Sequence, residues 1–258
     1  DEMFIEPELV KFEIELEGVF EYGIQQDLTF TFDPKRWGIV EGTVTDEVAL
    51  KNKEILNSII KKTKEIGITT FKIGAMDAYF KVDVNKIGRI ENSEGSIQIP
   101  SDFHLEMSDD TFIRVQPNGK ATYTLMTTYL TDNTTISGGN LVGDRFEHDY
   151  SPVYDAAGVD RKSHGWGHLL WIIASHDVVI DNVNLSKASG DGLVFHAKNL
   201  RNADGSLQPD NREVNNVLIK NTTIDECRRN GISILDGRNI TFDNCVVINT
   251  GQGPQAYD

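Results

Sequence analysis

A repeat in the second half of the chain constrains the fold more than any other sequence feature. The apolar run 178–185 returns as 217–224 and again as 240–247, and an earlier copy lies at 134–141. The last two copies are 23 residues apart, and the other spacings equal 23 residues plus polar inserts of about 16 and about 21 residues. A period of about 23 residues therefore runs through this half of the sequence.

A unit of about 23 residues with two or three short strands is too small to bury its apolar face alone. Stacked units give every strand a partner above and below and form a continuous apolar core. The units lack the helix or Leu-rich consensus of leucine-rich repeats. The repeat thus predicts an all-β solenoid, a parallel β-helix, in which Asn182, Asn221 and Asn244 stack at one turn. One further step of 23 residues before Ile136 lands on Ile113, inside another β-like run.

The first third of the chain predicts one helix and several short strands. Residues 46–66 carry apolar side chains at helical spacing, with Thr45 as N-cap and Gly67 as stop. A solenoid needs a cap with a polar outer face over its first rung, and this amphipathic helix suits that position. We predict a small β appendage or lead-in over 1–37 and a β-helix domain over 38–258. The expected strands span 9–16, 28–32, 69–73, 78–84, 96–99, 103–107 and 112–115.

Composition excludes several classes of protein. The 258 residues include 40 acidic and 25 basic ones, and the net charge of −15 argues against general nucleic-acid binding. No apolar run in the sequence is long enough to span a bilayer, so no membrane insertion is expected. Cys227 and Cys245 fall in different columns of the repeat, which predicts two free, mostly buried thiols.

Several motifs resemble one superfamily of known proteins. The motifs that carry the resemblance are 97–101, 105–107, 136–139, 190–192 and the Asn-rich rungs. Over about 38–258 the chain resembles the pectin-lyase-like right-handed β-helix superfamily. Within it, 143–150 followed by 164–167 resembles a subgroup of secreted bacterial polysaccharide-degrading proteins and bacteriophage tail proteins. The resemblance implies a polysaccharide or cell-surface glycan as partner and an extracellular location.

The repeat register predicts a polar column at one corner of the coil. The same offsets align His168 with Asp191 and Asn230, on rungs about 4.8 Å apart. Arg228 and Arg229 lie beside this column in the sequence register. The column is therefore a candidate site for chemistry.

A long insert, 143–165, leaves the coil at the same corner and is expected to hang over the column. Its mixture of charged, histidine and aromatic side chains suits sugar binding, because aromatic faces contact C–H surfaces and polar groups bind hydroxyls. A shorter polar insert around 199–212 leaves at another corner. The candidate catalytic residues are Asp191, His168, Asp144, Arg145, Asp149 and Arg229. The candidate substrate-binding residues are His148, Tyr150, Tyr154, His164, Trp166, Lys162, Arg228 and Asn230.

Two kinds of glycan cleavage fit these residues. Hydrolysis needs two carboxylates either about 5 Å or about 6.5–9.5 Å apart. Asp191 together with Asp144 or Asp149 could supply such a pair. β-Elimination beside a uronate carboxyl needs a base and a group that neutralises the carboxylate, for which an arginine, Lys162 or a histidine could serve.

Structural roles compete with each of these assignments. The glycine-flanked Asp191 could form only a turn, and His168 could be a hydrogen-bonded, half-buried histidine. Arg228 and Arg229 could be rim charges paired with acidic neighbours, and the tyrosines could simply pack the insert onto the coil. The Asp-rich loops could hold calcium, whereas no helix or tight turn fixes the histidines for zinc. No other cofactor is expected.

We predict an extracellular, glycan-directed β-helix protein that acts as a polysaccharide depolymerase of secreted or phage-tail type, either a lyase or a glycoside hydrolase. The alternative is a non-catalytic receptor-binding, adhesion or structural tail module, and a uronate epimerase would use the same site. No capping helix follows the last rung before Asp258, so we expect that the natural protein continues or that another chain covers this end. A homotrimer or larger assembly would favour a phage spike.

Overall fold

The computed structural model describes residues 28–82, 94–152, 164–199, 202, 204–206, 208 and 211–251. The strand predicted over 9–16 lies outside the described residues.

In the part of the chain that the structure describes, the strands form three parallel sheets. The seven-stranded sheet contains β1 (Thr29–Phe32), β2 (Thr70–Ile73), β5 (Phe103–Met107), β8 (Asp132–Ser137), β11 (His176–Asp181), β14 (Asn215–Lys220) and β17 (Arg238–Asp243). The six-stranded sheet contains β3 (Met76–Phe80), β6 (Thr111–Val115), β9 (Asn140–Val142), β12 (Asn184–Ser186), β15 (Thr223–Asp225) and β18 (Val246–Ile248). The five-stranded sheet contains β4 (Ile97–Gln98), β7 (Thr122–Tyr129), β10 (Trp166–Ile173), β13 (Leu193–His196) and β16 (Ile232–Ile234).

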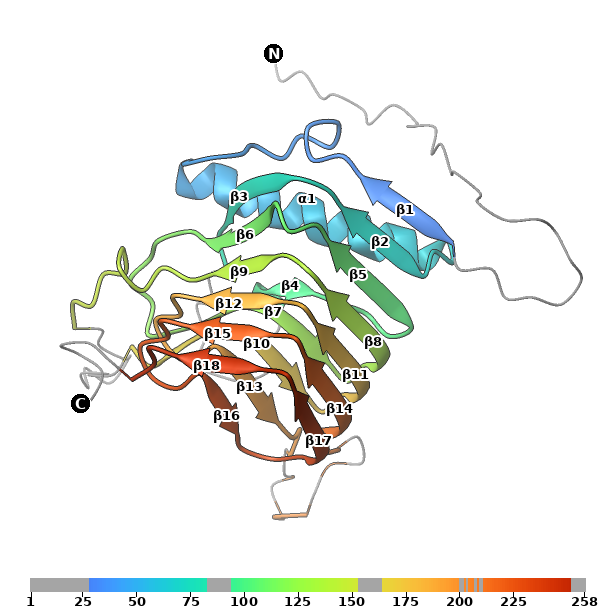
Figure 1. Cartoon of the computed structure of the whole chain (residues 1–258), viewed down its shortest axis with the longest axis vertical. Coiled ribbons are helices and arrows are strands. Elements are labelled where there is room, and N and C mark those ends of the chain that lie inside the picture. The colour runs from blue at the N-terminus through green and yellow to red at the C-terminus, as the bar shows by residue number, and fades with distance from the viewer. Residues whose placement is uncertain are drawn as a thin grey trace, which may run out of the picture.

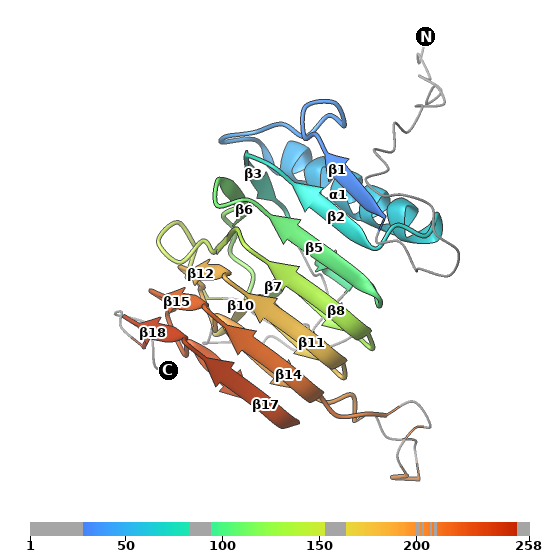
Figure 2. The same ribbon diagram turned by 45° about the vertical axis from the view of Figure 1, so that its right-hand side comes forward.

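Successive coils visit the three sheets in turn, so the chain winds as a right-handed parallel β-helix (Figure 1). One rung runs from β8 through β9 to β10, and the next runs from β11 through β12 to β13. Figure 2 shows the strands of the seven-stranded sheet side by side, from β1 near one end of the stack to β17 at the other. The predicted all-β solenoid is confirmed.

The register of the sheets follows the repeat. Ile180 pairs with Ile136 on one side and with Ile219 on the other, and Ile219 pairs in turn with Phe242. These apolar side chains occupy the same position in successive rungs, so the coils stack directly on one another. The alignment predicted for the second half of the chain is confirmed.

The further step of 23 residues, from Ile136 back to Ile113, is wrong. Ile136 pairs with Leu105, which lies 31 residues earlier, whereas Ile113 pairs with Leu141 in the six-stranded sheet. The coil from β5 to β8 contains the eight-residue strand β7 and the connection 116–121 that precedes it. Because this coil takes 31 residues rather than 23, a fixed step of 23 fails there.

The helix α1 (Asp46–Glu65) covers the first rung and agrees with the predicted span. The Thr45 hydroxyl accepts a hydrogen bond from the Val48 N–H over 3.4 Å, and Gly67 adopts a φ of +85° just beyond the end. Leu56 on the buried face joins the core of the solenoid. The N-cap and the stop predicted from the sequence are confirmed.

Two asparagines of α1 satisfy backbone groups of the first rungs. Asn57 donates to the Ser96 carbonyl oxygen over 2.9 Å and accepts from the Gln98 N–H over 3.0 Å, at strand β4. Asn52 donates to two backbone carbonyl oxygens, those of Val40 and Tyr79. Because an open strand edge can pair with another chain, these amides let α1 close this end of the solenoid.

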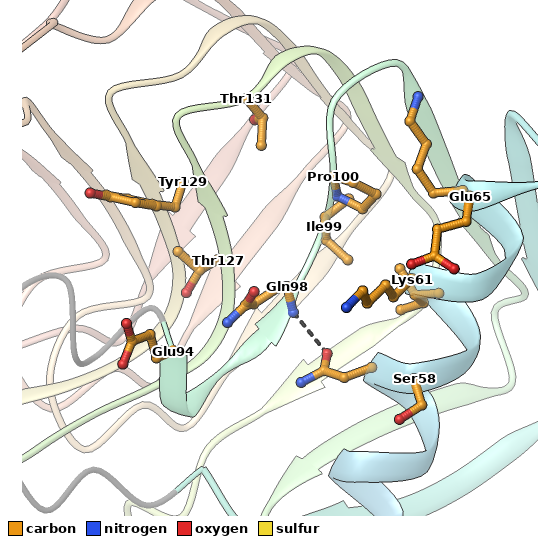
Figure 3. A pocket seen from close by; sticks show the side chains of 13 residues that line it. Ser58, Lys61, Glu65, Glu94, Gln98, Ile99, Pro100, Thr127, Tyr129 and Thr131 are labelled. Atoms are coloured by element: carbon orange, nitrogen blue, oxygen red, sulfur yellow. Dashed lines mark hydrogen bonds between the residues drawn. The ribbon is translucent and has the colours of Figure 1, made fainter. Parts of the chain in front are cut away.

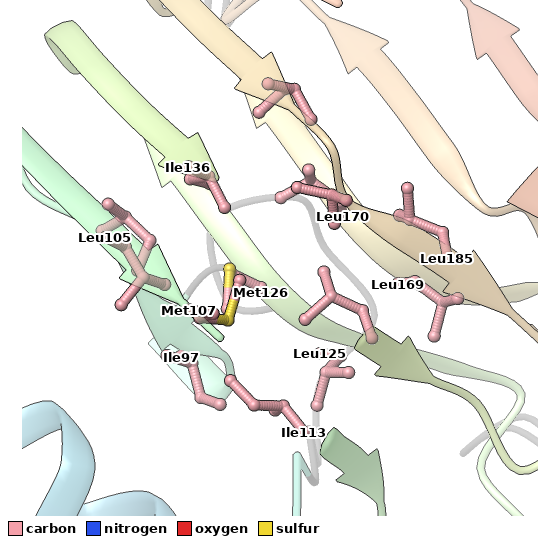
Figure 4. Packing of buried hydrophobic residues seen from close by; sticks show 14 of the residues in the cluster. Ile97, Leu105, Met107, Ile113, Leu125, Met126, Ile136, Leu169, Leu170 and Leu185 are labelled. Carbon is pink, nitrogen blue, oxygen red and sulfur yellow. The ribbon is translucent and has the colours of Figure 1, made fainter. Parts of the chain in front are cut away.

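A continuous apolar core fills the coil (Figure 4). Leu105 and Ile136 enter it from the seven-stranded sheet, Leu185 from the six-stranded sheet and Leu170 from the five-stranded sheet. Full burial of such a side chain contributes about 1.5–3 kcal/mol to folding. The core therefore supplies the main stabilisation of the stack.

Asparagines in the left-handed conformation form the turn that follows the strands of the seven-stranded sheet. Asn182, Asn221 and Asn244 have φ values of +55°, +52° and +50°. The Asn244 amide donates to Asn221 Oδ1 over 2.9 Å, and the Asn221 amide donates to Asp181 Oδ1 over the same distance. Asparagine tolerates this conformation better than other residues with a side chain, so the predicted stack is confirmed at this turn.

The remaining predictions about the fold concern the N-terminal strand, the two cysteines and membrane insertion. β1 pairs in parallel with β2 as the first strand of the seven-stranded sheet, while the division of the chain near residue 37 stays a prediction. Cys227 is buried, Cys245 is partly buried, and both are free thiols. Within the described residues, no helix is long and apolar enough to cross a bilayer.

Candidate functional site

The candidate site lies at the corner where the chain passes from the six-stranded to the five-stranded sheet. The connections that meet there are 116–121, the described parts 143–152 and 164–165 of the insert, 187–192 and 226–231. Backbone hydrogen bonds join neighbouring connections, such as the one from the Arg229 N–H to the Gly190 carbonyl oxygen over 3.1 Å. The corner is therefore built by stacked rungs together with the first part of the long insert.

The structure brings His168, Asp191 and Asn230 together. The Asp191 N–H donates to His168 Nδ1 over 3.3 Å, and the Asn230 N–H donates to Asp191 Oδ1 over 3.0 Å. The Ser233 hydroxyl donates to the other carboxylate oxygen, Asp191 Oδ2, over 2.9 Å. His168 and Asp191 are buried, whereas Asn230 is exposed. The column thus runs from the interior to the surface.

His168 is a neutral, packed imidazole at neutral pH. Burial lowers its pKa to about 4, against the smaller opposing effect of the Asp191 carboxylate. Its Nδ1 accepts a backbone hydrogen bond, so the single proton of the neutral ring sits on Nε2. Trp166 and Trp171 contact the ring edge-on, with ring centres 6.1 and 5.3 Å away. The nitrogen that could accept a proton is already used by the backbone.

Trp166 and Arg229 form the solvent-facing part of the corner. Trp166 is 45% exposed, and the Arg229 guanidinium lies 5.7 Å from the centre of its ring. Arg229 also donates to the Gly165 carbonyl oxygen over 2.8 Å, and its Nε lies 3.8 Å from Asp191 Oδ1. These contacts hold a cation between an aromatic face and a carboxylate. We call the following residues the corner patch: Trp166, Asp191, Arg229, Asn230 and Ser233.

Buried polar side chains hold the start of the insert in the corner. Asp144 is 1% exposed, and its carboxylate accepts hydrogen bonds from the Tyr123 hydroxyl and from His148 Nδ1. The backbone and side-chain nitrogens of Asn118 also donate to it, each over 3.1 Å. A carboxylate that already receives four hydrogen bonds from the protein does not suit direct contact with a sugar. Asp144 instead fits a role in holding the insert.

His148 and His164 continue the same network. His148 Nε2 lies 2.9 Å from His164 Nδ1, and His164 Nε2 lies 2.9 Å from the Ser151 carbonyl oxygen. The two residues are 7% and 3% exposed. Each histidine uses both ring nitrogens within this network, which does not suit the substrate contact expected from the sequence.

Arg228, Tyr150 and Arg145 brace the insert against the rungs. The Arg228 guanidinium lies 4.9 Å from the centre of the Tyr150 ring, and its Nε donates to the Ser189 carbonyl oxygen over 2.6 Å. The Tyr150 hydroxyl donates to the Arg145 carbonyl oxygen over 2.9 Å, and burial raises the pKa of Tyr150 to about 12. Arg145 donates to the Glu226 carbonyl oxygen. The side chains of Arg228, Tyr150 and Arg145 therefore make their contacts and hydrogen bonds within the protein.

Other predicted residues lie away from the buried network or outside the description. Asp149 is exposed, and hydrogen bonds from Ser151 lower its pKa below the ordinary value. Tyr154 and Lys162 lie outside the described residues. Among the residues that are described, no group of three His, Cys, Asp or Glu side chains is arranged to hold a metal ion. Calcium in the Asp-rich loops stays a prediction.

Sequence reasoning missed several members of the corner. Two of them are Tyr123 and Ser189. Tyr123 pairs in register with Gly167, and Ser189 lies one period of 23 residues after Trp166, so the repeat could have pointed to both residues. Asn118 lies in a connection and had no such signal. Ser233 pairs with Val194, an apolar position, so the repeat alone did not mark it as polar.

A groove of about 840 Å³ opens between α1 and the strands β4 and β7 (Figure 3). Lys61 and Glu65 line it from α1, and Gln98, Tyr129 and Thr131 line it from the opposite side. None of the site residues predicted from the sequence is among its described lining residues. The groove is therefore a concave surface beside the cap and separate from the corner patch.

Comparison with known sequences finds relatives of longer length. No protein-family model matches the chain. The SPbeta prophage-derived uncharacterized protein YorA of Bacillus subtilis strain 168 is 30% identical over 62% of this chain. The uncharacterized protein YclG of the same strain is 30% identical over 69% of this chain. The chain spans only 27% and 28% of the length of these two relatives.

Comparison with solved structures shows the fold. The A-module of mannuronan C-5 epimerase AlgE4 from Azotobacter vinelandii has a TM-score of 0.55 at 14% identity, over 84% of this chain and 50% of that one. Iota-carrageenase complexed to iota-carrageenan fragments has a TM-score of 0.54 at 15% identity, over 85% of this chain and 42% of that one. The predicted resemblance to right-handed β-helix proteins is confirmed as a likeness of fold.

Proposed function

We propose that this chain is an extracellular, glycan-directed β-helix whose corner patch binds an acidic polysaccharide. The observation that carries the proposal is the exposed Trp166 ring with Arg229 fixed over it and Asp191 behind it. Binding sites for organic ligands combine aromatic surface with a few placed polar groups, and the arginine fork matches a carboxylate in shape and charge. A net charge of −15 disfavours a polyanion elsewhere on the molecule, so this local cation determines where one binds.

Depolymerisation by β-elimination is better supported at this patch than hydrolysis. Hydrolysis needs a second available carboxylate within about 5–9.5 Å of the first. Asp144 is buried with its oxygens occupied, and Asp149 hydrogen-bonds Ser151 within its own loop. The described residues therefore supply Asp191 as the candidate acid–base group of the patch.

Three residues, Arg229, Asp191 and Trp166, each have one role in the elimination. Arg229 pairs with the uronate carboxylate, which makes the hydrogen on the neighbouring carbon more acidic. Asp191 accepts that proton, since its carboxylate receives two hydrogen bonds and keeps acceptor capacity. The freed electron pair forms the new C=C bond, and the C–O bond to the leaving sugar breaks. The leaving oxygen keeps the electron pair of that bond and takes a proton from water. Trp166 supports the sugar ring.

A non-catalytic receptor-binding or structural tail module is the second candidate. It is favoured by the similarity to a prophage-derived protein and by the engagement of His168 Nδ1 with the backbone. Such a module would use the same patch to hold a glycan without cleaving it. A homotrimer would suit this candidate.

A panel of uronate-containing, sulfated and neutral polysaccharides tests the proposal. New ultraviolet absorbance from an unsaturated uronate marks elimination, and new reducing ends without absorbance mark hydrolysis. Binding without either product marks the receptor-binding candidate. We expect Trp166→Ala and Arg229→Ala to weaken binding of the acidic members at least about tenfold.

Arg238→Ala provides the matched control. Arg238 is an exposed arginine on β17 that pairs with Glu213, so its loss changes the net charge equally without touching the patch. Binding by this variant should equal that of the wild type. Wild-type protein that binds none of the polysaccharides, or patch variants that bind as well as the wild type, would contradict the proposal.

A further inference from the structure

A tight turn at the start of the insert presents an exposed aromatic ring. The Glu147 N–H donates to the Asp144 carbonyl oxygen over 2.8 Å, which closes a four-residue turn with Arg145 and Phe146 at its centre. The buried Asp144 side chain holds the first residue of this turn through its hydrogen bonds. Phe146 is 62% exposed, and no large apolar side chain among the described residues is more exposed. The turn therefore directs Phe146 towards solvent from a fixed backbone.

Arg145 lies over this ring and is itself fixed. Its guanidinium is 5.1 Å from the centre of the Phe146 ring and donates to the Glu226 carbonyl oxygen. The Arg145 backbone N–H donates to the Lys187 carbonyl oxygen over 3.0 Å. A guanidinium carries five N–H donors, so donors remain for a ligand. Within the described part of the chain no carboxylate forms an ion pair with Arg145, so its charge is also available.

The same combination occurs at Trp166. There the Arg229 guanidinium lies 5.7 Å from the centre of a ring whose residue is 45% exposed. We call Arg145 with Phe146 the turn pair, and Arg229 with Trp166 the patch pair. Each pair presents an aromatic face to solvent beside a fixed cation, which is the combination that carries the proposed function.

Both pairs are attached to one connection, 226–231. Arg145 is bonded to the carbonyl group of Glu226, and Arg229 follows three residues later in the chain. Three residues of fully extended chain span at most about 11 Å. The two attachment points are therefore close enough for one oligosaccharide to contact both pairs.

A buried contact between the two pairs fixes their spacing. The Arg228 guanidinium lies 4.9 Å from the centre of the Tyr150 ring, and Arg228 is only 5% exposed. The Tyr150 hydroxyl donates to the Arg145 carbonyl oxygen over 2.9 Å, whereas Arg228 directly precedes Arg229 in the chain. This contact thus joins the turn to the corner patch. A ligand that binds both pairs does not have to order them first.

We infer that the turn pair is a second subsite for the acidic polysaccharide, so that two sugars of one chain bind at the two pairs. The inference rests on the proposed function of the corner patch and defines its substrate class more closely. Two guanidinium groups at a fixed spacing favour a glycan with closely spaced acidic groups, such as a polyuronate or a polysulfated chain. Because the second contact is intramolecular once the first has formed, affinity rises with chain length.

Titration calorimetry with oligomers of galacturonate, of mannuronate and of carrageenan tests the subsite. In the series that the wild type binds, we expect affinity to rise at least about tenfold from the shortest oligomers to those that contact both pairs. Phe146→Ala should bind the long oligomers only about as tightly as the wild type binds the shortest ones. Trp166→Ala should weaken binding at every length.

The charge of the turn pair is tested separately from its ring. Arg145→Gln keeps a donor for the Glu226 carbonyl oxygen but removes the positive charge, so we expect it to reduce the rise with length as Phe146→Ala does. Oligomers of hyaluronate, in which uronates alternate with uncharged sugars, should bind the wild type less tightly than fully acidic oligomers of the same length. Equal or tighter binding of hyaluronate would contradict the inferred substrate class.

Conservative variants distinguish a sugar contact from loss of apolar bulk. Phe146→Tyr keeps the aromatic face and should retain the rise of affinity with length, whereas Phe146→Leu should lose it. Val40→Ala is the matched control, because it shortens another exposed apolar side chain, 48% exposed, in the segment before α1. Binding by Val40→Ala should equal that of the wild type. Both positions are exposed, so these variants keep the packed core.

The results for the two pairs separate the subsite from the proposed function. A wild-type affinity that does not rise with length, or an equal rise in Phe146→Ala, would overturn the subsite while weaker binding by Trp166→Ala still supported the corner patch. Wild-type protein that binds none of the oligomers, or Trp166→Ala that binds them as well as the wild type, would contradict the proposed function itself.

Discussion

At the corner, the number of hydrogen bonds that a buried carboxylate receives decides its role. Asp144 and Asp191 are both buried carboxylates, yet Asp144 receives four hydrogen bonds and Asp191 receives two. The first is thus fixed within the buried network that holds the start of the insert. The second keeps capacity for a proton and lies beside the exposed Arg229.

The lowered pKa of His168 predicts that acid destabilises the folded protein. Its pKa is lowered from 6.5 to about 4, so the folded state binds the proton more weakly than the unfolded chain does. Stability that is present above the ordinary histidine pKa is therefore lost as the pH falls towards about 4. The loss amounts to about 3 kcal/mol, at 1.36 kcal/mol for each pKa unit.

Urea unfolding at neutral pH and near pH 4 measures this loss. The wild type should lose about 3 kcal/mol more than His168→Gln between the two conditions, whatever the stability of the variant at neutral pH. Equal losses in the two proteins would show that His168 is not the titrating group.

At the level of elements, α1 closes the solenoid by mimicking a strand. Asn57 supplies one donor and one acceptor to the backbone of β4, as a neighbouring strand would. Asn52 does the same for the backbone around Val40. The helix therefore covers the apolar core and also satisfies polar backbone groups that the first rung leaves unpaired.

Asn57→Ala should destabilise the fold by about 1–3 kcal/mol, because two backbone groups of β4 lose their partner. Chemical denaturation measures the change. Lys61→Ala, an exposed position one turn later on α1, is the control and should alter stability by less than about 0.5 kcal/mol. A loss for Asn57→Ala no larger than that of the control would contradict the strand-mimic role.

Over the whole molecule, the periodic features and the capping helix could be predicted, whereas the contacts of the non-periodic insert could not. A coil of 23 residues places Ile219 beside Phe242, and the same offset brings His168 beside Asp191, so the fold and the column follow from the repeat. The buried network around Asp144 depends on contacts of a non-periodic insert with Asn118 and Tyr123. No repeat encodes these contacts, which is why residues expected at the surface are buried in the network.

The charge distribution of the whole molecule also shapes the proposed function. With a net charge of −15, the surface repels an acidic polysaccharide at distances up to a Debye length, about 8 Å at physiological ionic strength. Attraction is confined to places where an arginine stays near the surface, as Arg229 does over Trp166. We therefore expect the glycan to bind at one corner rather than along the solenoid.

The structure of the protein with a bound acidic oligosaccharide tests this placement most directly. We expect a sugar ring against the face of Trp166, with its carboxylate or sulfate within hydrogen-bond distance of Arg229. An oligosaccharide found instead in the groove between α1 and β7, with the corner patch empty, would contradict it.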